Sequence, residues 1–357
     1  ALLGQIMANF AKSIAVAGTH GKTTTTSMIT EILLAGNCDP TISVGGILHS
    51  IGGNVRVGKS DIFVTEACEY TNSFLSFYPT IDVILNVKAD HLDFFKDIDD
   101  IRHSFKLFTE KLPKDGTLII NTDIDNYEYF YKDTDCEVIT VGSNPAISRY
   151  SAADIAYDSA GCCSYTLLID NKPNGTIKLG VPGEHNVYNA LAATAVGLSL
   201  GLSLDQISSG ILKAKTIGGR TNLLNTGSMT VIDDCYNANP VSMKASIDVL
   251  ATAEGRKIAV LGDMGELGEN EKKLHYEVGE YLATKEIDVL FCAGELSEEI
   301  AKAAQKESKT CEVYYFKTRD ALLEQLLPFL KKGDTVLVKA SHFMEYPKIV
   351  KALTDCQ

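Results

Sequence analysis

The stretch GTHGKT, residues 18–23, constrains the fold of this chain more than any other. The apolar run SIAVAG (13–18) before it predicts a buried strand, and KTTTTSMITEILLAG (22–36) after it predicts a helix that ends at a glycine. A glycine-rich turn between a strand and a helix lets backbone N–H groups approach an anion, and the helix N-terminus adds a positive partial charge. The stretch therefore predicts a phosphate-binding loop in an α/β fold.

Within this loop, Lys22 is positioned to reach terminal phosphates, and the Thr23 hydroxyl to bind Mg²⁺. Val16 stands where the longer form of such loops has a glycine, so this is the shortened G-x-x-G-K-T form. The alternative is a glycine-rich turn with a surface lysine, but the order of strand, loop and helix favours phosphate binding. The predicted contacts to the phosphates are Gly18, Thr19, His20, Gly21, Lys22, Thr23 and Thr24.

The rest of the chain alternates short apolar runs with helical patterns, which is typical of parallel βαβ units. A glycine-rich break, TIGGR (216–220), separates two such series. We therefore predict two α/β domains, 1–216 and 217–357, with a mainly parallel sheet in the first. Polar/apolar alternation and an Asn-Gly turn within residues 145–180 predict a small antiparallel insertion.

Composition excludes several classes of protein. The net charge is −13 with no cluster of Lys and Arg, so neither nucleic acid nor an anionic membrane surface is an expected partner. No apolar run approaches the roughly 20 residues that span a bilayer, and the first residues lack a secretory signal. Nine cysteines without a C-x-x-C pair fit reduced thiols. We expect a cytoplasmic protein, and a monomer.

Acidic and imidazole side chains follow two further predicted strands. VTEACEY (64–70) carries Glu66 and Glu69, and NVKADHLD (86–93) carries Asn86 and His91. Ligands gather at the carboxyl ends of parallel strands, so a carboxylate and an imidazole here could coordinate a second Mg²⁺. The alternatives are solvated strand-end charges for the glutamates and a hydrogen-bonded loop residue for His91.

Four motifs, GTHGKTTTT, EACE, DHLD and GEHNVYNALAA (183–193), occur in this order along the chain. In them the chain resembles the ATP-dependent Mur ligases of peptidoglycan synthesis. The resemblance implies a central P-loop ATPase domain and a C-terminal Rossmann-like α/β domain. It also implies that the N-terminal UDP-binding domain of the family is absent from this chain, which begins about a dozen residues before its first strand.

The resemblance divides between two branches of the family. Residues 1 to about 215 are similar to the branch that adds L-alanine, notably in EACEYTNSF. From about Gly218 the chain resembles the branch that adds D-alanyl-D-alanine, in VIDDCYNANPVSMKASI (231–247), VLGDMGELGE (260–269) and TVLVKASHFMEY (335–346). Several members carry a carbamylated lysine on the helix after DHLD, where this chain has Phe105, with Lys106 beside it. His342 replaces the arginine of a Lys-Gly-Ser-Arg motif.

The resemblance implies a two-step ligation with ATP and Mg²⁺. A carboxylate of a UDP-N-acetylmuramoyl substrate forms an acyl phosphate, and the amino group of an amino acid or dipeptide then displaces phosphate. Lys22, Glu66 and His91 are the implied catalytic residues, and Thr23, Glu66 and His91 the implied Mg²⁺ ligands, with Glu69 a less certain one.

The implied contacts to the rest of the nucleotide lie on several segments. His185, Asn186 and Asn189 would meet adenine; the alternative is that Asn186 caps the helix. The remaining implied contacts are Asn86, Arg220 (to phosphate), Asp234 (to ribose) and Asn237; for Asp233-Asp234 the alternative is an ordinary strand-end turn.

Other functions stay open or are disfavoured. GDMGELG (262–268) lacks the G-x-G-x-x-G spacing, so we do not expect a nicotinamide site, and Met264, Tyr314 and Tyr315 are expected to pack in the core or in turns. The alternatives to a peptidoglycan ligase are a nucleotide-binding fragment without ligase activity and a relative of the folate polyglutamylating ligase. A P-loop kinase or GTPase lacks support, because its base-recognition and lid motifs are missing.

Overall fold

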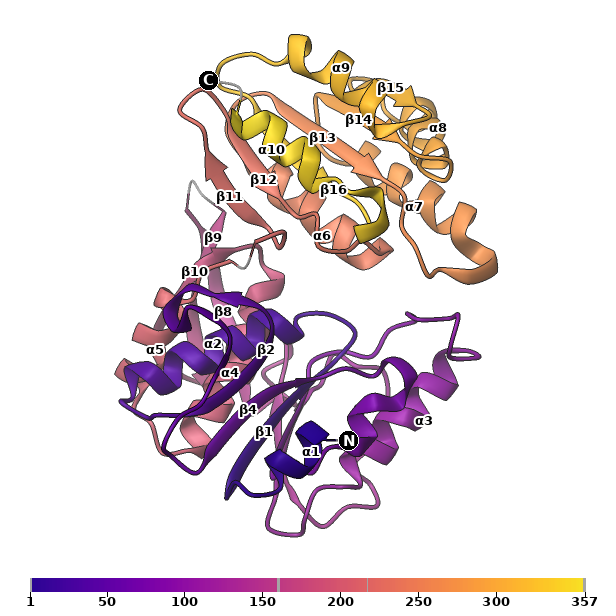
Figure 1. Cartoon of the computed structure of the whole chain (residues 1–357). Helices are drawn as coiled ribbons and strands as arrows, with labels where there is room; N and C mark the ends of the chain where they lie inside the picture. The colour runs from indigo at the N-terminus through magenta and orange to yellow at the C-terminus, as the bar shows by residue number, and fades with distance from the viewer. Residues whose placement is uncertain (1, 159–160, 217, 356–357) are drawn as a thin grey trace. The chain divides into compact units, whose positions relative to one another are not determined.

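The computed structural model describes residues 2–158, 161–216 and 218–355. The chain divides into two compact units (Figure 1): the described residues of unit 1 are 2–158 and 162–215, and those of unit 2 are 161, 216 and 218–355. Each unit is a mainly parallel sheet with helices on both faces. The α/β class predicted from the alternation of apolar runs and helical patterns is thereby confirmed.

Unit 1 is built on a ten-stranded sheet with the order β10-β9-β8-β7-β6-β5-β1-β4-β2-β3. The strands from β7 to β2 in that order are parallel to one another. The predicted antiparallel segment is the meander β8–β10, and it continues the main sheet beyond β7. The strands are β1 (Lys12–Ala17), β2 (Thr41–Leu48), β3 (Gly53–Arg56), β4 (Ile62–Ala67), β5 (Ile81–Ile84), β6 (Thr117–Asn121), β7 (Glu137–Val141), β8 (Tyr150–Tyr157), β9 (Cys162–Ile169) and β10 (Lys172–Pro182).

Helices cover both faces of this sheet. One face carries the core built from α2, α4 and α5, with Met28, Val187 and Ile207 fully buried. The other carries α1 and α3, where Phe105 and Phe108 are fully buried. The helices are α1 (Leu2–Met7), α2 (Lys22–Ala35), α3 (Ile98–Thr109), α4 (His185–Ser199) and α5 (Leu204–Lys213), with short 3-10 turns η1 (His49–Ile51), η2 (Tyr70–Ser76) and η3 (Tyr127–Phe130).

Unit 2 contains a six-stranded sheet with the order β11-β12-β16-β13-β14-β15, parallel except for the β11–β12 pair. Helices α6, α7 and α8 pack on one face, and α9 and α10 on the other. The strands are β11 (Asn222–Asn225), β12 (Thr230–Asp233), β13 (Lys257–Gly262), β14 (Val289–Ala293), β15 (Glu312–Phe316) and β16 (Thr335–Lys339); the helices are α6 (Pro240–Ala251), α7 (Glu271–Ala283), α8 (Ser297–Glu307), α9 (Arg319–Phe329) and α10 (Pro347–Asp355), with η4 (Gly268–Asn270) and η5 (His342–Met344).

Two apolar patterns of the sequence run further than the elements that form on them. The run DVILNV (82–87) forms a strand only as far as Ile84, and beyond it the Asn86 carbonyl accepts from the N–H of Thr19 at 3.1 Å. The helical pattern IDDIRHSFKLFTEKL (98–112) forms an α-helix only as far as Thr109. Beyond it, Lys111 N and Leu112 N donate to the carbonyls three residues back, which is the tighter 3-10 pattern.

Candidate functional site

The loop between β1 and α2 has the backbone geometry of an anion-binding turn. Gly21 precedes α2 with a left-handed φ of 83°, and a Cβ there would lie 2.4 Å from Oδ1 of Asn189. Gly18 has a φ of 143°, and a Cβ there would meet Asn86 N at 3.2 Å. No side chain caps the first turn of α2. Both positions therefore require glycine, and the helix presents its N-terminal N–H groups uncapped, as phosphate binding requires.

Asn86 and Thr19 fix the shape of this loop. The Asn86 side chain accepts from His20 N at 2.9 Å and donates to His20 O at 3.0 Å. The Thr19 hydroxyl accepts from Lys88 N at 2.9 Å. Asn86 thus acts on the backbone of the loop, a role that the sequence pattern did not indicate; its predicted contact with nucleotide stays a prediction.

Lys22, at the first position of α2, is paired with Glu69. Its ammonium donates to the Glu69 carboxylate at 2.9 and 3.2 Å and to the Gly18 carbonyl at 2.6 Å. Glu69 is 2% exposed. Burial is the largest single influence and acts to lower the pKa of Lys22, but the charges of Glu69, Cys68 and Glu66, together with the hydrogen bonds to Glu69, outweigh it and the pKa is raised. Lys22 is therefore held positively charged within the phosphate loop.

Thr23 and Glu66 form a second pair. The Thr23 hydroxyl donates to Oε2 of Glu66 at 2.9 Å, and Oε1 accepts from Gly45 N at 2.6 Å. Glu66 is the second-to-last residue of β4, which lies beside β1 in the sheet, so strand register brings it to the loop. A hydroxyl and a carboxylate at this separation are the hard oxygen ligands that Mg²⁺ takes. These two residues therefore fit the predicted metal site.

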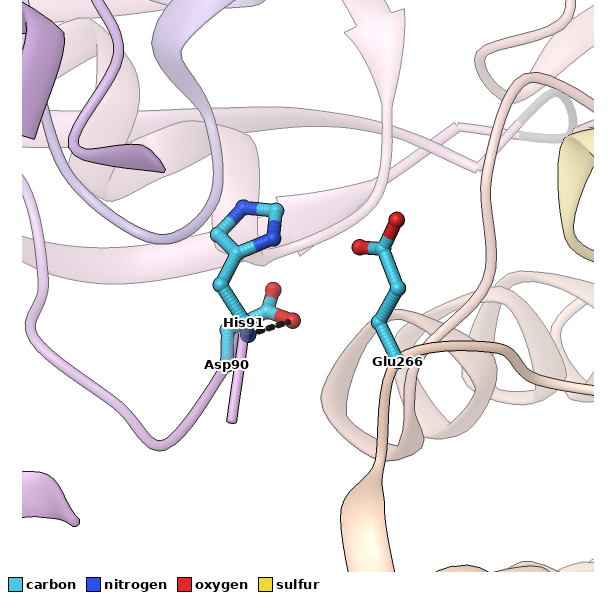
Figure 2. A group of neighbouring side chains, drawn as sticks. All are labelled: Asp90, His91 and Glu266. Carbon is cyan, nitrogen blue, oxygen red and sulfur yellow. Dashed lines mark hydrogen bonds between the residues drawn. The ribbon is translucent and has the colours of Figure 1, made fainter. Parts of the chain in front are cut away.

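His91 lies on the segment that follows β5, next to Asp90 (Figure 2). Its N–H donates to Oδ1 of Asp90 at 2.9 Å, and its φ of 50° is left-handed. The ring of Tyr70 lies 4.6 Å from the His91 ring, centroid to centroid, and the Tyr70 hydroxyl donates to Asp93 at 2.9 Å. Glu266, also drawn in Figure 2, is a residue of unit 2. The contribution of His91 to a metal site stays a prediction.

The start of α4 brings two predicted residues to the phosphate loop. Asn189 donates to Oδ1 of Asn186 at 2.8 Å, and Asn186 donates to Pro182 O at 2.6 Å. Both side chains are buried, and Oδ1 of Asn189 faces Gly21. Asn186 is the second residue of α4 and does not cap it, so the capping alternative is wrong. His185 is the first residue of the same helix.

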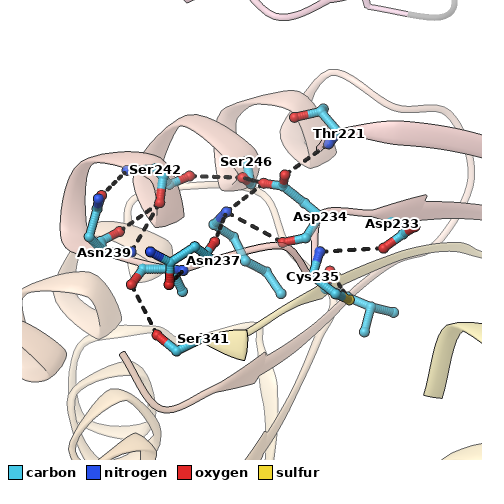
Figure 3. Close-up of polar contacts among 12 residues, drawn as sticks. Thr221, Asp233, Asp234, Cys235, Asn237, Asn239, Ser242, Ser246 and Ser341 are labelled. Carbon is cyan, nitrogen blue, oxygen red and sulfur yellow. Dashed lines mark hydrogen bonds and ion pairs between the residues drawn. The ribbon is translucent and has the colours of Figure 1, made fainter. Parts of the chain in front are cut away.

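In unit 2, the Asp234 carboxylate lies at the centre of a buried network (Figure 3). Its Oδ1 accepts from Thr221 N at 2.8 Å, and its Oδ2 accepts from Lys339 Nζ at 2.6 Å and from the Ser246 hydroxyl. Asp234 is 7% exposed. Neither Ser246 nor Lys339 was predicted to belong to a site, although Lys339 ends an apolar strand and begins the Lys339-Ala340-Ser341-His342 stretch.

The other two predicted residues of unit 2 lie beside this network. The Arg220 guanidinium carbon is 3.9 Å from the centroid of the Tyr236 ring. Oδ1 of Asn237 accepts from Ala238 N at 2.9 Å, and its carbonyl accepts from Lys339 at 3.0 Å. The structure therefore gathers Arg220, Asp234 and Asn237 at the end of β12.

Two family models match the chain. The Mur ligase middle domain matches residues 16–197, and the Mur ligase, glutamate ligase domain matches residues 219–342. The chain belongs to the Mur ligase family.

Relatives and solved structures extend this result. A UDP-N-acetylmuramate--L-alanine ligase of Lachnospira eligens is 64% identical over 251 residues, which are 70% of this Mur ligase and 54% of the relative. One of Caldanaerobacter subterraneus is 39% identical over 350 residues, 94% of this chain and 74% of the relative. MurF from Acinetobacter baumannii superposes with a TM-score of 0.82 at 27% identity, covering 96% of this chain and 76% of that one. The match to the first relative spans about half of its length.

The glycine-rich GDMGELG loop of this Mur ligase is anchored to its own unit. Met264 is fully buried, as expected for a core residue, and its N–H donates to Nε2 of His275 at 2.8 Å. Burial lowers the pKa of His275, which favours the neutral ring that accepts this bond. Asp263 accepts from Leu296 N at 3.1 Å and Ser297 N at 2.6 Å, so a carboxylate takes the N-terminus of α8 and disfavours a phosphate there.

Phe105, where the resemblance places a carbamylated lysine in several family members, is part of the core here. Phe105 is fully buried against the ring of Phe74, at 5.3 Å between centroids. Lys106 donates to Glu110 at 2.7 Å and to Asp133, and these two contacts raise its pKa. Within the described ranges, no helix is long and apolar enough to cross a membrane.

Proposed function

We propose that this Mur ligase uses ATP to activate the carboxylate of a UDP-N-acetylmuramoyl substrate and joins it to an amine. The observation that carries the proposal is the loop at the start of α2, where an uncapped helix N-terminus, the charged Lys22 and the Thr23–Glu66 pair converge. The substrate class comes from the relatives, which are named UDP-N-acetylmuramate--L-alanine ligase.

The proposed reaction has two steps. A carboxylate oxygen of the substrate attacks the γ-phosphorus, the bond to the bridging oxygen breaks, and ADP leaves. The amine nitrogen then attacks the acyl carbon and loses a proton, and the carbon–oxygen bond breaks to release phosphate. Two anions meet in the first step, so neutralising charge is the main task of the site.

The residues of unit 1 divide this task. Lys22 and the N–H groups of α2 hold the terminal phosphates, and the raised pKa of Lys22 keeps its charge. Thr23 and Glu66, with His91, would hold Mg²⁺, which when bound neutralises charge on the phosphates. Glu69 orients Lys22 through its two hydrogen bonds. Residues 1–216 thus act as the ATP-binding domain.

Further residues complete nucleotide binding in this proposal. His185, Asn186 and Asn189 contact adenine, and the contact of Asn189 with Gly21 supports a common site. Residues 217–357 form the second domain, from which Arg220 contacts phosphate and Asp234 and Asn237 contact the ribose side. We place the reaction in the cytoplasm, with the protein acting as a monomer.

The first candidate for the amine is L-alanine, which the names of the relatives support. The likeness to MurF from Acinetobacter baumannii, and the stretch VIDDCYNANP, support a second candidate, D-alanyl-D-alanine. In that case the second domain descends from a different branch of the family than the first.

Phosphate release separates these possibilities. The protein is incubated with Mg-ATP, UDP-N-acetylmuramate and either L-alanine or D-alanyl-D-alanine. Both incubations are then repeated with UDP-N-acetylmuramoyl-tripeptide in place of UDP-N-acetylmuramate. We expect release that needs both UDP-N-acetylmuramate and L-alanine. Release that needs tripeptide and dipeptide selects the second candidate. If the protein binds ATP but releases no phosphate in any pairing, it is a nucleotide-binding fragment without ligase activity. A further incubation with a folate and glutamate tests the last alternative, because phosphate release there would indicate a relative of the folate polyglutamylating ligase.

A further inference from the structure

The turn that follows β4, residues 69–74, carries two successive residues that contact predicted catalytic residues. Glu69 accepts hydrogen bonds from Lys22 at 2.9 and 3.2 Å. The next residue, Tyr70, places its ring 4.6 Å from that of His91, centroid to centroid. The conformation of the 69–74 turn therefore affects the positions of both Lys22 and His91.

Directly after Tyr70, the backbone of this turn is strained. Thr71 has a φ of 54° and a ψ of 24°, and Asn72 has a φ of 56° and a ψ of 25°. Two successive residues that are not glycine are thus left-handed. Asparagine tolerates this conformation, but a β-branched threonine rarely adopts it. Such strain persists only where the surrounding contacts determine the conformation.

Hydrogen bonds within the 69–74 turn are local. The Ser73 hydroxyl donates to the carbonyls of Cys68 and Tyr70, both at 2.9 Å. Asn72 N donates to the Glu69 carbonyl at 2.9 Å. Because these bonds join close neighbours in sequence, they shape the turn but do not fix it to the rest of unit 1.

Helix α3 fixes the turn from outside. The hydroxyl of Ser104, which is 3% exposed, donates to Oδ1 of Asn72. Two residues further on, the ring of Phe74 stacks on that of Phe108 at 4.5 Å between centroids. A path of hydrogen bonds thus runs from α3 through the left-handed Asn72 to the backbone of Glu69.

We propose that Ser104 is a positioning residue for the phosphate loop and acts through Asn72. By holding the strained turn in one conformation, it keeps the Glu69 carboxylate against Lys22 and the Tyr70 ring against that of His91. The proposal rests on the proposed function in that Lys22 contacts the phosphates of ATP. Because Ser104 is uncharged and buried, its removal changes the positions of these groups without changing the charge of the site.

The dissociation constant of ATP tests the link to Lys22. Ser104→Ala should weaken ATP binding about tenfold, because Glu69 no longer holds the lysine in one place. Ser148→Ala is the matched control. Ser148 is also a serine of unit 1 that is 3% exposed, and its hydroxyl bonds to that of Thr122 at 2.7 Å. ATP binding should not change in this variant.

Asn72→Gly separates positioning from packing. Glycine adopts the left-handed conformation without support, so in the Asn72→Gly background the turn no longer depends on the serine of α3. Adding Ser104→Ala to that background should therefore weaken ATP binding no further. A loss that is the same in both backgrounds would mean that Ser104 only packs α3, and that result, or no loss at all, would overturn the proposal.

NMR spectra of the protein without ligand test the link to His91. The carbon-bound ring protons of His91 are shifted by the nearby Tyr70 ring, and they are assigned by their disappearance in His91→Asn. In Ser104→Ala these resonances should move toward their positions in Tyr70→Leu, whereas in Ser148→Ala they should not move. Unchanged His91 resonances in folded Ser104→Ala would contradict the proposal. Failure of the wild type to bind ATP would count against the proposed function, and these spectra would still decide the role of Ser104.

Discussion

Unit 1 and unit 2 each contain a lysine paired with a buried carboxylate, and the two pairs differ in what surrounds them. Lys22 and Glu69 lie 2.9 Å apart with side chains 16% and 2% exposed. Lys339 and Asp234 lie 2.6 Å apart with side chains 2% and 10% exposed. The ion pairs alone are nearly equivalent, so their roles are set by their neighbours.

The first pair lies in a turn that attracts anions, and the second in a network that is complete. Lys22 begins α2, whose N-terminus no side chain caps, and Gly18 and Gly21 let Asn86 and Asn189 approach the loop closely. The Asp234 carboxylate instead accepts from Thr221 N and Ser246 in addition to Lys339. The comparison indicates that the first pair lies beside backbone donors that are free to bind an anion, whereas the second pair also holds the backbone of Thr221 in place.

The largest effect is expected at the first pair. Lys22→Met should lower ATP-dependent phosphate release by about 10³-fold, because a charge that stabilises the transferred phosphate is lost. Lys106→Met is the matched control, since that lysine lies on α3 and pairs with Glu110, directly after α3, and with Asp133, after η3. Phosphate release within a factor of a few of the wild type in Lys22→Met would show that the pair is structural.

The second pair should act mainly on stability. Lys339→Met leaves the Asp234 carboxylate buried without its charge partner, so the free energy of unfolding should fall by about 3–5 kcal/mol. Adding Asp234→Asn removes the stranded charge and should recover much of that loss. Urea unfolding of both variants measures it, and a loss confined to the double variant would contradict the comparison.

A third buried carboxylate extends the comparison of the two ion pairs, because no lysine pairs with it among the described residues. Both oxygens of Asp82 on β5 are buried and without a hydrogen-bond partner among the described residues. Burial raises the pKa of Asp82 well above its ordinary value. Asp82→Asn should therefore stabilise the protein by about 1–3 kcal/mol at neutral pH.

The sign of the pH dependence follows from that raised pKa. Below the ordinary pKa of an aspartate, the carboxyl is protonated in both folded and unfolded protein, so it does not affect stability. As the pH rises toward the raised pKa, the unfolded chain ionises first and the folded protein is disfavoured. The advantage of Asp82→Asn should thus grow from acidic to neutral pH in thermal unfolding; an advantage independent of pH would mean that the carboxyl is not the cause.

The smallest effect is expected at Lys106 on α3, whose side chain is 12% exposed. Lys106 has a raised pKa because of its hydrogen bonds to Asp133 and Glu110, so its amine stays protonated and does not react with CO₂. Phosphate release should be the same with and without added bicarbonate, and Lys106→Met should not change it. Stimulation by bicarbonate that Lys106→Met abolishes would assign this lysine a role in the site.

The sequence predicts most of the fold and the phosphate loop because their determinants are local. GTHGKT, the strand before it and the helix after it are contiguous, and the glycines have the left-handed φ values that the motif implies. Glu66 could also be predicted as a candidate, since it lies near the carboxyl end of a strand, β4, that pairs with β1.

The missing part of the site depends on contacts between distant residues. Lys22 and Glu69 are 47 positions apart, and Asp234 and Lys339 are 105 apart. Strand order and side-chain direction determine which carboxylate pairs with which lysine. No local sequence pattern predicts either of them. For the same reason Ser246, which reaches Asp234 from α6, was not anticipated.

The most direct test of the account follows an oxygen atom through the reaction. UDP-N-acetylmuramate labelled with a heavy oxygen isotope in its carboxylate is incubated with the protein, Mg-ATP and L-alanine, and the released phosphate is analysed by mass spectrometry. Activation as an acyl phosphate predicts that each phosphate carries one labelled oxygen, because the carbon–oxygen bond of the intermediate breaks. Unlabelled phosphate would contradict the account, since it would come from water attacking ATP.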